Sequence, residues 1–207
     1  MDEAGLPRRE RERQAHRSEI MRTALELFSQ RGFHNVSMQE IAHRAEFAVG
    51  TLYNFFKDKE DLYKALVLEQ AEMFDNELNK AIDSTGEEIE KIRSYIRAKG
   101  EVFSANIPMI RLYFMETQGV SFNIKAGLEL EIRERYEVFL RKVAAVFESG
   151  IRKQKFQNLL DPYYMAVALD SLTNAFLFLW LEDPEQHPYS RNVDAIVKLF
   201  FEKLEAS

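Results

Sequence analysis

Cysteine is absent from the 207-residue sequence, and glycine and proline are scarce, with 8 and 5 residues. A chain without cysteine forms no disulfide, holds no thiolate nucleophile and offers no cysteine ligand to zinc. Few glycines and prolines leave little of the turn chemistry that many short strands require. Apolar residues make up 46% of the chain. We therefore expect an all-α fold, with enough length for one domain of ordinary size or two small ones.

Long apolar segments are scarce as well. Residues 1–20 contain no apolar segment, so we expect no secretory signal and a cytoplasmic location. The apolar stretch 163–181 approaches membrane length but contains Asp170, Thr173 and Asn174. Polar groups of this kind are costly in lipid. We therefore expect a helix buried within protein, and no membrane partner.

Candidates for catalysis are sparse. An enzyme would need a nucleophile, a metal site or paired carboxylates in a cleft. The four histidines are scattered, and no two have the spacing of metal ligands. They are His16, His34, His43 and His187. We expect no enzymatic activity, no metal and no cofactor.

The charge is unevenly distributed along the chain. Residues 1–60 hold ten basic and ten acidic side chains, so the net charge of −6 belongs to the remainder. Five arginines are bunched near the N-terminus, at Arg8, Arg9, Arg11, Arg13 and Arg17. The bunching predicts a flexible basic arm over residues 1–13 that meets phosphates. The alternative is a solvated, disordered tail, because Glu10 and Glu12 are interleaved with the arginines.

Three helices are predicted in the first third of the chain, over about 16–31, 38–45 and 49–56. Ser37 can cap the second helix while Glu40 reaches back to its backbone, which is a capping box. A turn of three residues, Glu46-Phe47-Ala48, separates the second helix from the third. Two short helices around such a turn, with a supporting helix before them, predict a helix-turn-helix.

The third helix has an unusual outward face. Its apolar and polar side chains fall on opposite faces, with Leu52, Phe55 and Phe56 against Gly50, Tyr53, Asn54 and Lys57. A face of this kind can lie in the major groove of DNA, where a glycine permits close approach and polar groups reach phosphates or base edges. Lys57 and Lys59 then meet the flanking backbone. The alternative is that these polar residues are ordinary solvated surface.

Residues 36–66, VSMQEIAHRAEFAVGTLYNFFKDKEDLYKAL, resemble the DNA-binding signature of TetR-type transcriptional regulators. The resemblance covers about 14–76, with the helix-turn-helix at about 37–56, and implies binding to a double-stranded DNA operator. By this resemblance, Tyr53 and Lys57 contact phosphate. The matching DNA-contact positions are Ser37, Gln39, Thr51, Tyr53, Asn54 and Lys57.

The chain departs from the family pattern in the turn. Glu46-Phe47-Ala48 stands where the family often has Gly-Val-Ser, and Val49 stands where a basic or polar residue is frequent. A glutamate in place of glycine predicts strain and local negative charge. These changes are the reason to keep an alternative function open, namely a small-molecule-binding helical dimer with weak or lost DNA binding.

A second, C-terminal domain is predicted over 77–207. Helical spacing predicts a long connecting helix over about 59–83 and a helix over about 86–104, followed by a shorter helix that ends at about 118. Further helices are predicted over about 126–150 and 162–182, and a last one ends at about 205. Thr85 with Glu88 is a second capping-box candidate. Asp161-Pro162 suits an N-cap and first helical position.

The resemblance implies that the last two helices pair with their copies across a two-fold axis to form a homodimer. The penultimate helix is apolar on nearly all sides, so one packing partner cannot cover it. The alternative is a helix enclosed by its own domain. The expected dimer contacts are Leu172, Phe176, Leu179, Ile196 and Phe200.

Many large side chains in the C-terminal domain can line an apolar pocket as well as fill a core. The expected pocket residues are Phe103, Tyr113, Phe114, Phe122, Tyr136, Phe139, Asn174 and Trp180. The resemblance, together with these features, implies a ligand-responsive repressor that acts as a homodimer on a pseudo-palindromic operator, and the aromatic composition suggests an apolar or aromatic small molecule as its effector.

Overall fold

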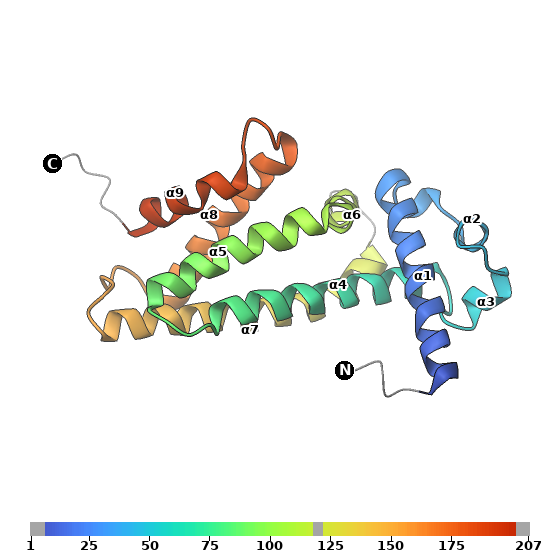
Figure 1. Cartoon of the computed structure of the whole chain (residues 1–207), viewed down its shortest axis with the longest axis horizontal. Helices are drawn as coiled ribbons and strands as arrows, with labels where there is room; N and C mark the ends of the chain where they lie inside the picture. The colour runs from blue at the N-terminus through green and yellow to red at the C-terminus, as the bar shows by residue number, and fades with distance from the viewer. Residues whose placement is uncertain (1–6, 118–121, 202–207) are drawn as a thin grey trace. The chain divides into compact units, whose positions relative to one another are not determined.

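The computed structural model describes the backbone of residues 7–117 and 122–201, and the side chains of residues 7–112 and 130–201 (Figure 1). Within these ranges the chain is helical, without strands, so the expected all-α fold is confirmed. The first four α-helices and the short 3-10 helix are α1 (Arg8–Arg31), η2 (Phe33–Asn35), α2 (Met38–Arg44), α3 (Val49–Tyr53) and α4 (Lys59–Ile82). The others are α5 (Glu88–Ala105), α6 (Ile107–Thr117), α7 (Phe122–Arg152), α8 (Pro162–Glu182) and α9 (Tyr189–Phe201).

The contacts between residues divide the chain into two compact units. Unit 1 holds the described residues of 1–71 and 106–129, and unit 2 holds those of 72–105 and 130–207. Unit 1 thus includes α6, which packs against α1. The contiguous domains expected over 14–76 and 77–207 stay a prediction.

The helix α1 begins at Arg8, about eight residues earlier than expected. The prediction of a flexible arm is therefore wrong for residues 8–13, and residues 1–6 lie outside the described part. Arginine and glutamate are good helix formers, and Arg8 Nε lies 2.7 Å from Glu12 Oε1 across one turn. The helix ends at Gly32, whose φ of 79° lies in the left-handed region that glycine adopts without strain.

Local capping signals place α2 and α8 where the sequence predicted them. The Glu40 N–H donates to Ser37 Oγ at 3.2 Å, and the Ser37 N–H donates to Glu40 Oε2 at 2.8 Å, so the capping box is formed. Asp161 Oδ1 accepts from the Tyr163 N–H at 2.9 Å and begins α8. The second capping box was wrong: α5 begins at Glu88 itself, whose carboxylate instead accepts from Ser149 Oγ at 2.9 Å.

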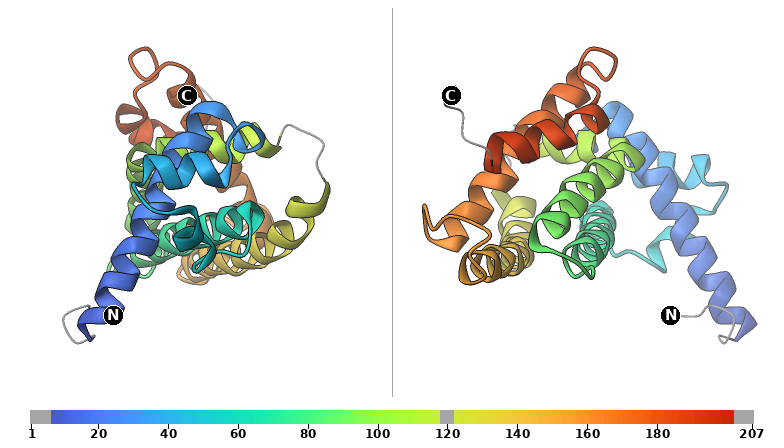
Figure 2. Two further views of the ribbon diagram at one scale, coloured as in Figure 1. Left: turned by 90° about the vertical axis from the view of Figure 1, so that its right-hand side faces the viewer. Right: turned by 60° about the vertical axis from the view of Figure 1, so that its left-hand side comes forward.

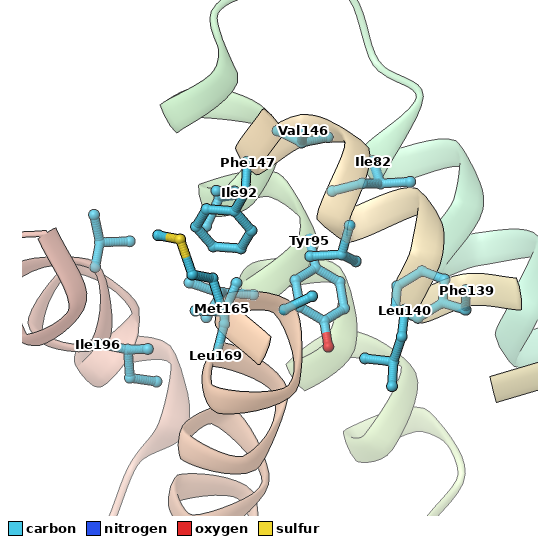
Figure 3. Close-up of a cluster of buried hydrophobic side chains, with 14 of the residues drawn as sticks. Ile82, Ile92, Tyr95, Phe139, Leu140, Val146, Phe147, Met165, Leu169 and Ile196 are labelled. Atoms are coloured by element: carbon cyan, nitrogen blue, oxygen red, sulfur yellow. The ribbon is translucent and has the colours of Figure 1, made fainter. Parts of the chain in front are cut away.

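The core of unit 2 is built by α5, α7, α8 and α9, with Ile82 from the end of α4 (Figure 3). Tyr95, Phe147 and Leu169 are completely buried there, each from a different helix. In this unit α9 lies beside α8 and α5 (Figure 2). Ile196 of α9 is 0% exposed in this core. Its expected role at a dimer interface was wrong, because the side chain already packs within its own chain.

The helix α8 is covered on one side only. Met165, Ala166 and Leu169 are buried, whereas Tyr164 and Leu179 are exposed. It is the one helix among the described residues that is long and apolar enough to cross a membrane, and 33% of its apolar window is buried. A single such helix is weak support for a membrane span, because core helices of soluble proteins share these features.

Candidate functional site

The helix-turn-helix of unit 1 is formed by α2 and α3, which pack against each other. The turn between them follows Ala45, and the Phe47 N–H donates to the Ala42 carbonyl at 2.9 Å. Glu46 has a φ of 60°, a left-handed conformation that is unusual for glutamate. The strain expected from a glutamate at this position is therefore a feature of the structure. Leu52, completely buried, anchors α3 to the unit.

The outward face of α3 is open. A β-carbon added at Gly50 would meet no atom within 4 Å. Tyr53 is 49% exposed, Asn54 and Lys57 are exposed, and Thr51 is half-buried. Regular helix ends at Tyr53, earlier than the expected residue 56, and Asn54 continues the chain in a turn. Most of the predicted contact residues thus share one accessible surface, which offers hydroxyl, amide and ammonium groups to a partner.

Two predicted contact residues lie on α2 or just before it. Gln39 is exposed, so it is available to a partner. Ser37 is half-buried and serves as the N-cap, with its hydroxyl donating to Glu40 Oε2 at 2.9 Å. The hydrogen bonds from the Ser37 backbone and hydroxyl, helped by Arg31, lower the pKa of Glu40 to about 2. Glu40 is therefore charged at neutral pH, and it holds Ser37 in place.

Lys59 has a different role from the one predicted. Its ammonium donates to the backbone carbonyls of Phe33 at 2.9 Å and Val36 at 2.8 Å. It also lies 4.4 Å from the centroid of the Phe33 ring. Because these contacts hold the ammonium inside unit 1, we assign Lys59 to the packing of this unit and remove it from the expected phosphate contacts.

Unit 2 contains a buried polar cluster that the sequence analysis missed. Asp170 of α8 forms an ion pair with Lys99 of α5, and both side chains are almost fully buried. The Tyr95 hydroxyl donates to Asp170 Oδ1 at 2.5 Å. The Tyr136 hydroxyl and the Asn174 amide donate to Asp170 Oδ2 at 2.7 and 2.9 Å. One carboxylate therefore joins α5, α7 and α8.

Burial and charge act in opposite directions on the pKa values in this cluster. Burial lowers the pKa of the Lys99 ammonium, although Asp170 opposes the change. Burial acts to raise the pKa of Asp170, but the charge of Lys99 and the hydrogen bonds from its partners outweigh it, and the pKa is lowered. Burial, followed by the charge of Asp170, raises the pKa of Tyr95. Asp170 is thus a charged acceptor and Tyr95 a protonated donor.

The predicted pocket residues do not line one cavity. Tyr136 and Asn174 meet at Asp170, whereas Phe139 is 5% exposed and belongs to the hydrophobic core. Phe103 stacks on Phe74 with ring centroids 6.4 Å apart, and Trp180 packs partly buried against the core. The side chains of Tyr113, Phe114 and Phe122 lie outside the described residues. A cavity of about 250 Å³ lies elsewhere in unit 2, and its lining includes Ile82, Glu88, Lys91 and Lys142.

The expected dimer surface is partly accessible. Leu179 is 43% exposed, while Leu172, Phe176 and Phe200 are half-buried against the core of unit 2. The exposed side chains of α8 recur every three or four residues, which places them along one face. They are Tyr164, Ala168, Ser171, Ala175, Phe178, Leu179 and Glu182.

The known proteins that this chain resembles are transcriptional regulators. Residues 20–66 match the model of the family described as bacterial regulatory proteins, tetR family. The HTH-type transcriptional regulator UidR of Escherichia coli (strain K12) is 41% identical over 61 residues, which are 30% of this chain and 31% of UidR. The match therefore spans about a third of that relative.

Two further matches cover more of the chain at lower identity. The fatty acid metabolism regulator protein of Bacillus subtilis (strain 168) is 24% identical over 145 residues, which are 69% of this chain and 72% of that protein. The solved structure of the transcriptional regulator FadR from Bacillus subtilis in complex with stearoyl-CoA has a TM-score of 0.75 at 19% identity. It covers 91% of this chain and 99% of that one, and at such identity the likeness shows the fold alone.

Proposed function

We propose that the chain, whose residues 20–66 match the model of the TetR family of regulators, is a sequence-specific DNA-binding transcriptional regulator that responds to a small molecule. The observation that carries this proposal is the open face of α3, where Gly50, Tyr53 and Asn54 are exposed together. An exposed helix that presents a glycine and polar side chains fits the major groove. With DNA as its partner, the protein acts in the cytoplasm in this proposal, and this function requires no enzymatic step.

The protein acts as a homodimer in this proposal. The exposed face of α8 carries Phe178 and Leu179 beside small residues such as Ala175. Apolar surface of this kind is stabilised when a second copy covers it, and a two-fold axis lets each copy present the same face. Two identical DNA-reading heads then require a pseudo-palindromic operator with half-sites about 34–36 Å apart or somewhat more.

Sedimentation tests the dimer independently of DNA. We expect a dimer at micromolar concentration, and Leu179→Glu, a change on the exposed face, should shift the protein towards monomer. A matched control is Glu182→Gln, one turn further along α8, which removes a charge without placing one among apolar groups. A wild-type protein that sediments as a monomer contradicts the proposed assembly.

The effector binds in unit 2 in this proposal, and an apolar or aromatic molecule fits its composition. Two matches, both from Bacillus subtilis, support fatty acyl compounds as the first probes: the sequence match is named a fatty acid metabolism regulator, and the structure match was solved with stearoyl-CoA. Tyr136 and Asn174 are the predicted pocket residues that lie beside a buried charge, so they suit the polar end of such a molecule. Binding changes the placement of α4, or of α6 against α1, and so changes operator affinity.

The decisive experiment is a gel shift with DNA from upstream of the protein's own gene, followed by footprinting. We expect protection of two related half-sites, and a probe of equal length with scrambled half-sites serves as the control. Equal affinity for both probes favours the alternative, a small-molecule-binding dimer with weak DNA binding. The strain and negative charge of Glu46 are the observations that support this alternative. Effector coupling is then measured in both directions, because linkage requires equal ratios of affinities.

A further inference from the structure

The N-terminal half of α1 contacts the aromatic residues that flank α3. The guanidinium carbon of Arg13 lies 5.7 Å from the centroid of the Phe55 ring, and that of Arg17 lies 5.6 Å from the Phe56 ring. The rings of His16 and Phe47 meet edge to face, with centroids 5.0 Å apart. These distances are typical of cation–π and aromatic contacts.

The three α1 side chains share one face of the helix, because positions 13, 16 and 17 are three and four residues apart. Their aromatic partners stand on both sides of α3: Phe47 lies in the turn before it, and Phe55 and Phe56 follow its last residue, Tyr53. Arg17 is further fixed by its Nη1, which donates to Glu69 Oε2 on α4 at 2.7 Å.

A helix as short as α3 is not stable by itself, so its orientation depends on the groups around it. Phe56 is 2% exposed and Leu52 is 0% exposed, and both fix the inward side of this segment. Phe47 and Phe55 are half-buried, and the basic side chains of α1 cover them. The extension of α1 back to Arg8 places these covering groups on a rigid element.

We propose that Arg13, His16 and Arg17 form a brace that holds the recognition helix α3 in position, and that Arg13 and Arg17 act by this contact and not by binding phosphate. The inference rests on the proposed DNA-binding function. For Arg13 and Arg17, it replaces the expectation that the bunched arginines bind phosphate. The brace sets the direction in which Tyr53 and Asn54 meet the groove.

The salt dependence of operator binding separates the two roles. A side chain that contacts phosphate contributes a slope of about 0.9 to the plot of log affinity against log salt, and one that positions a helix contributes none. We expect Arg13→Ala to lower operator affinity by about two- to five-fold per protomer with an unchanged slope. Arg13→Lys should restore affinity, because an ammonium also binds a ring face. A slope that falls by about 2 in the dimer overturns the proposal.

Hydrogen–deuterium exchange tests the brace without DNA. In the free protein we expect the amides of residues 47–56 to exchange about two- to five-fold faster in Arg13→Ala and in Arg17→Ala. The matched control is Arg9→Ala, an exposed arginine one turn earlier on α1, which should leave these amides unchanged. Circular dichroism confirms that each variant keeps its helices. Unchanged exchange in both brace variants overturns the inference, and a wild-type protein that binds no operator refutes the proposed function while this measurement still decides the brace.

Discussion

Lys99 and Asp170 form an ion pair in the interior of unit 2, although 71 residues separate them in the sequence. Removing one partner of a buried pair leaves an uncompensated charge, which typically costs about 3–5 kcal/mol. We therefore expect Asp170→Asn to lower the free energy of unfolding by about this amount, as measured by urea denaturation. Tyr95 and Tyr136 donate to different oxygens of Asp170, and asparagine keeps only one of these acceptors, so the loss includes a hydrogen bond as well as the charge.

A double mutant tests whether the pair itself accounts for that loss. We expect Lys99→Met with Asp170→Asn to be markedly more stable than the sum of the single changes indicates, because neither charge is then left alone. Tyr136→Phe is the matched control at the half-exposed edge of the cluster, and loss of its hydrogen bond should cost about 1 kcal/mol. Additive single effects would show that Lys99 and Asp170 do not stabilise each other.

Glu46 gives a prediction about both strain and charge. A left-handed conformation costs a non-glycine residue about 1–2 kcal/mol, so Glu46→Gly should raise the free energy of unfolding by about 1 kcal/mol. Glu46→Gln keeps the strain and removes the negative charge near the DNA-facing surface. We expect both variants to bind operator about two- to five-fold more tightly, while only the glycine raises the melting temperature. A glycine variant that melts below the wild type would contradict the strain.

The positions of several helices could be predicted from the sequence because their signals are local. Ser37 with Glu40 fixes the start of α2, Asp161 fixes the start of α8, and Gly32 fixes the end of α1. A cap acts on backbone groups within three residues of itself, so a short window contains the whole interaction. The start of α1 was missed because its first turns carry charged residues and no apolar periodicity.

The contacts that were missed join residues far apart in the sequence. Lys59 donates a hydrogen bond to the carbonyl of Phe33, and Asp170 accepts hydrogen bonds from residues of two other helices. Spacing shows which residues share a face of a helix, but it does not show which helix covers that face. Ile196 was placed at a dimer interface for this reason, since an apolar stripe looks the same whether its own core or a second copy covers it.

The capping box of α2 makes stability depend on pH. The pKa of Glu40 is about 2 in the folded protein, below its ordinary value of 4.5. A carboxyl whose pKa is lowered by folding stabilises the fold above its unfolded pKa, and this contribution is lost as the pH falls from about 4.5 to 2. The difference in unfolding free energy between the wild type and Glu40→Gln should therefore be constant above about pH 5 and shrink below it.

A second carboxylate serves as the control for that measurement. Glu60, exposed in the first turn of α4, is changed to glutamine in the same series. Ser37→Ala, which removes the cap hydroxyl, should cost about 1 kcal/mol at neutral pH. A Glu40→Gln variant whose deficit is independent of pH between 2 and 7 would show that the capping carboxylate contributes no linked stability.

Lys57 and Lys59 form a matched pair, two residues apart, for which the structure assigns different roles. Lys57 is exposed beyond α3, so Lys57→Ala should weaken binding to all DNA sequences about equally and lower the salt slope by about 2 in the dimer, one unit per lysine. Lys59→Ala removes two charge-assisted hydrogen bonds and should lower the free energy of unfolding by about 1–3 kcal/mol. The Lys59 change should leave the slope intact, because its ammonium faces the carbonyls of Phe33 and Val36. Operator titrations from 50 to 300 mM salt, with melting curves of both variants, measure the two effects separately. Asn54→Ala in the same series should change which half-site bases are preferred, since a side chain that reads base edges carries sequence information and a phosphate contact does not. A slope that falls equally for both lysines would return Lys59 to the DNA-binding surface.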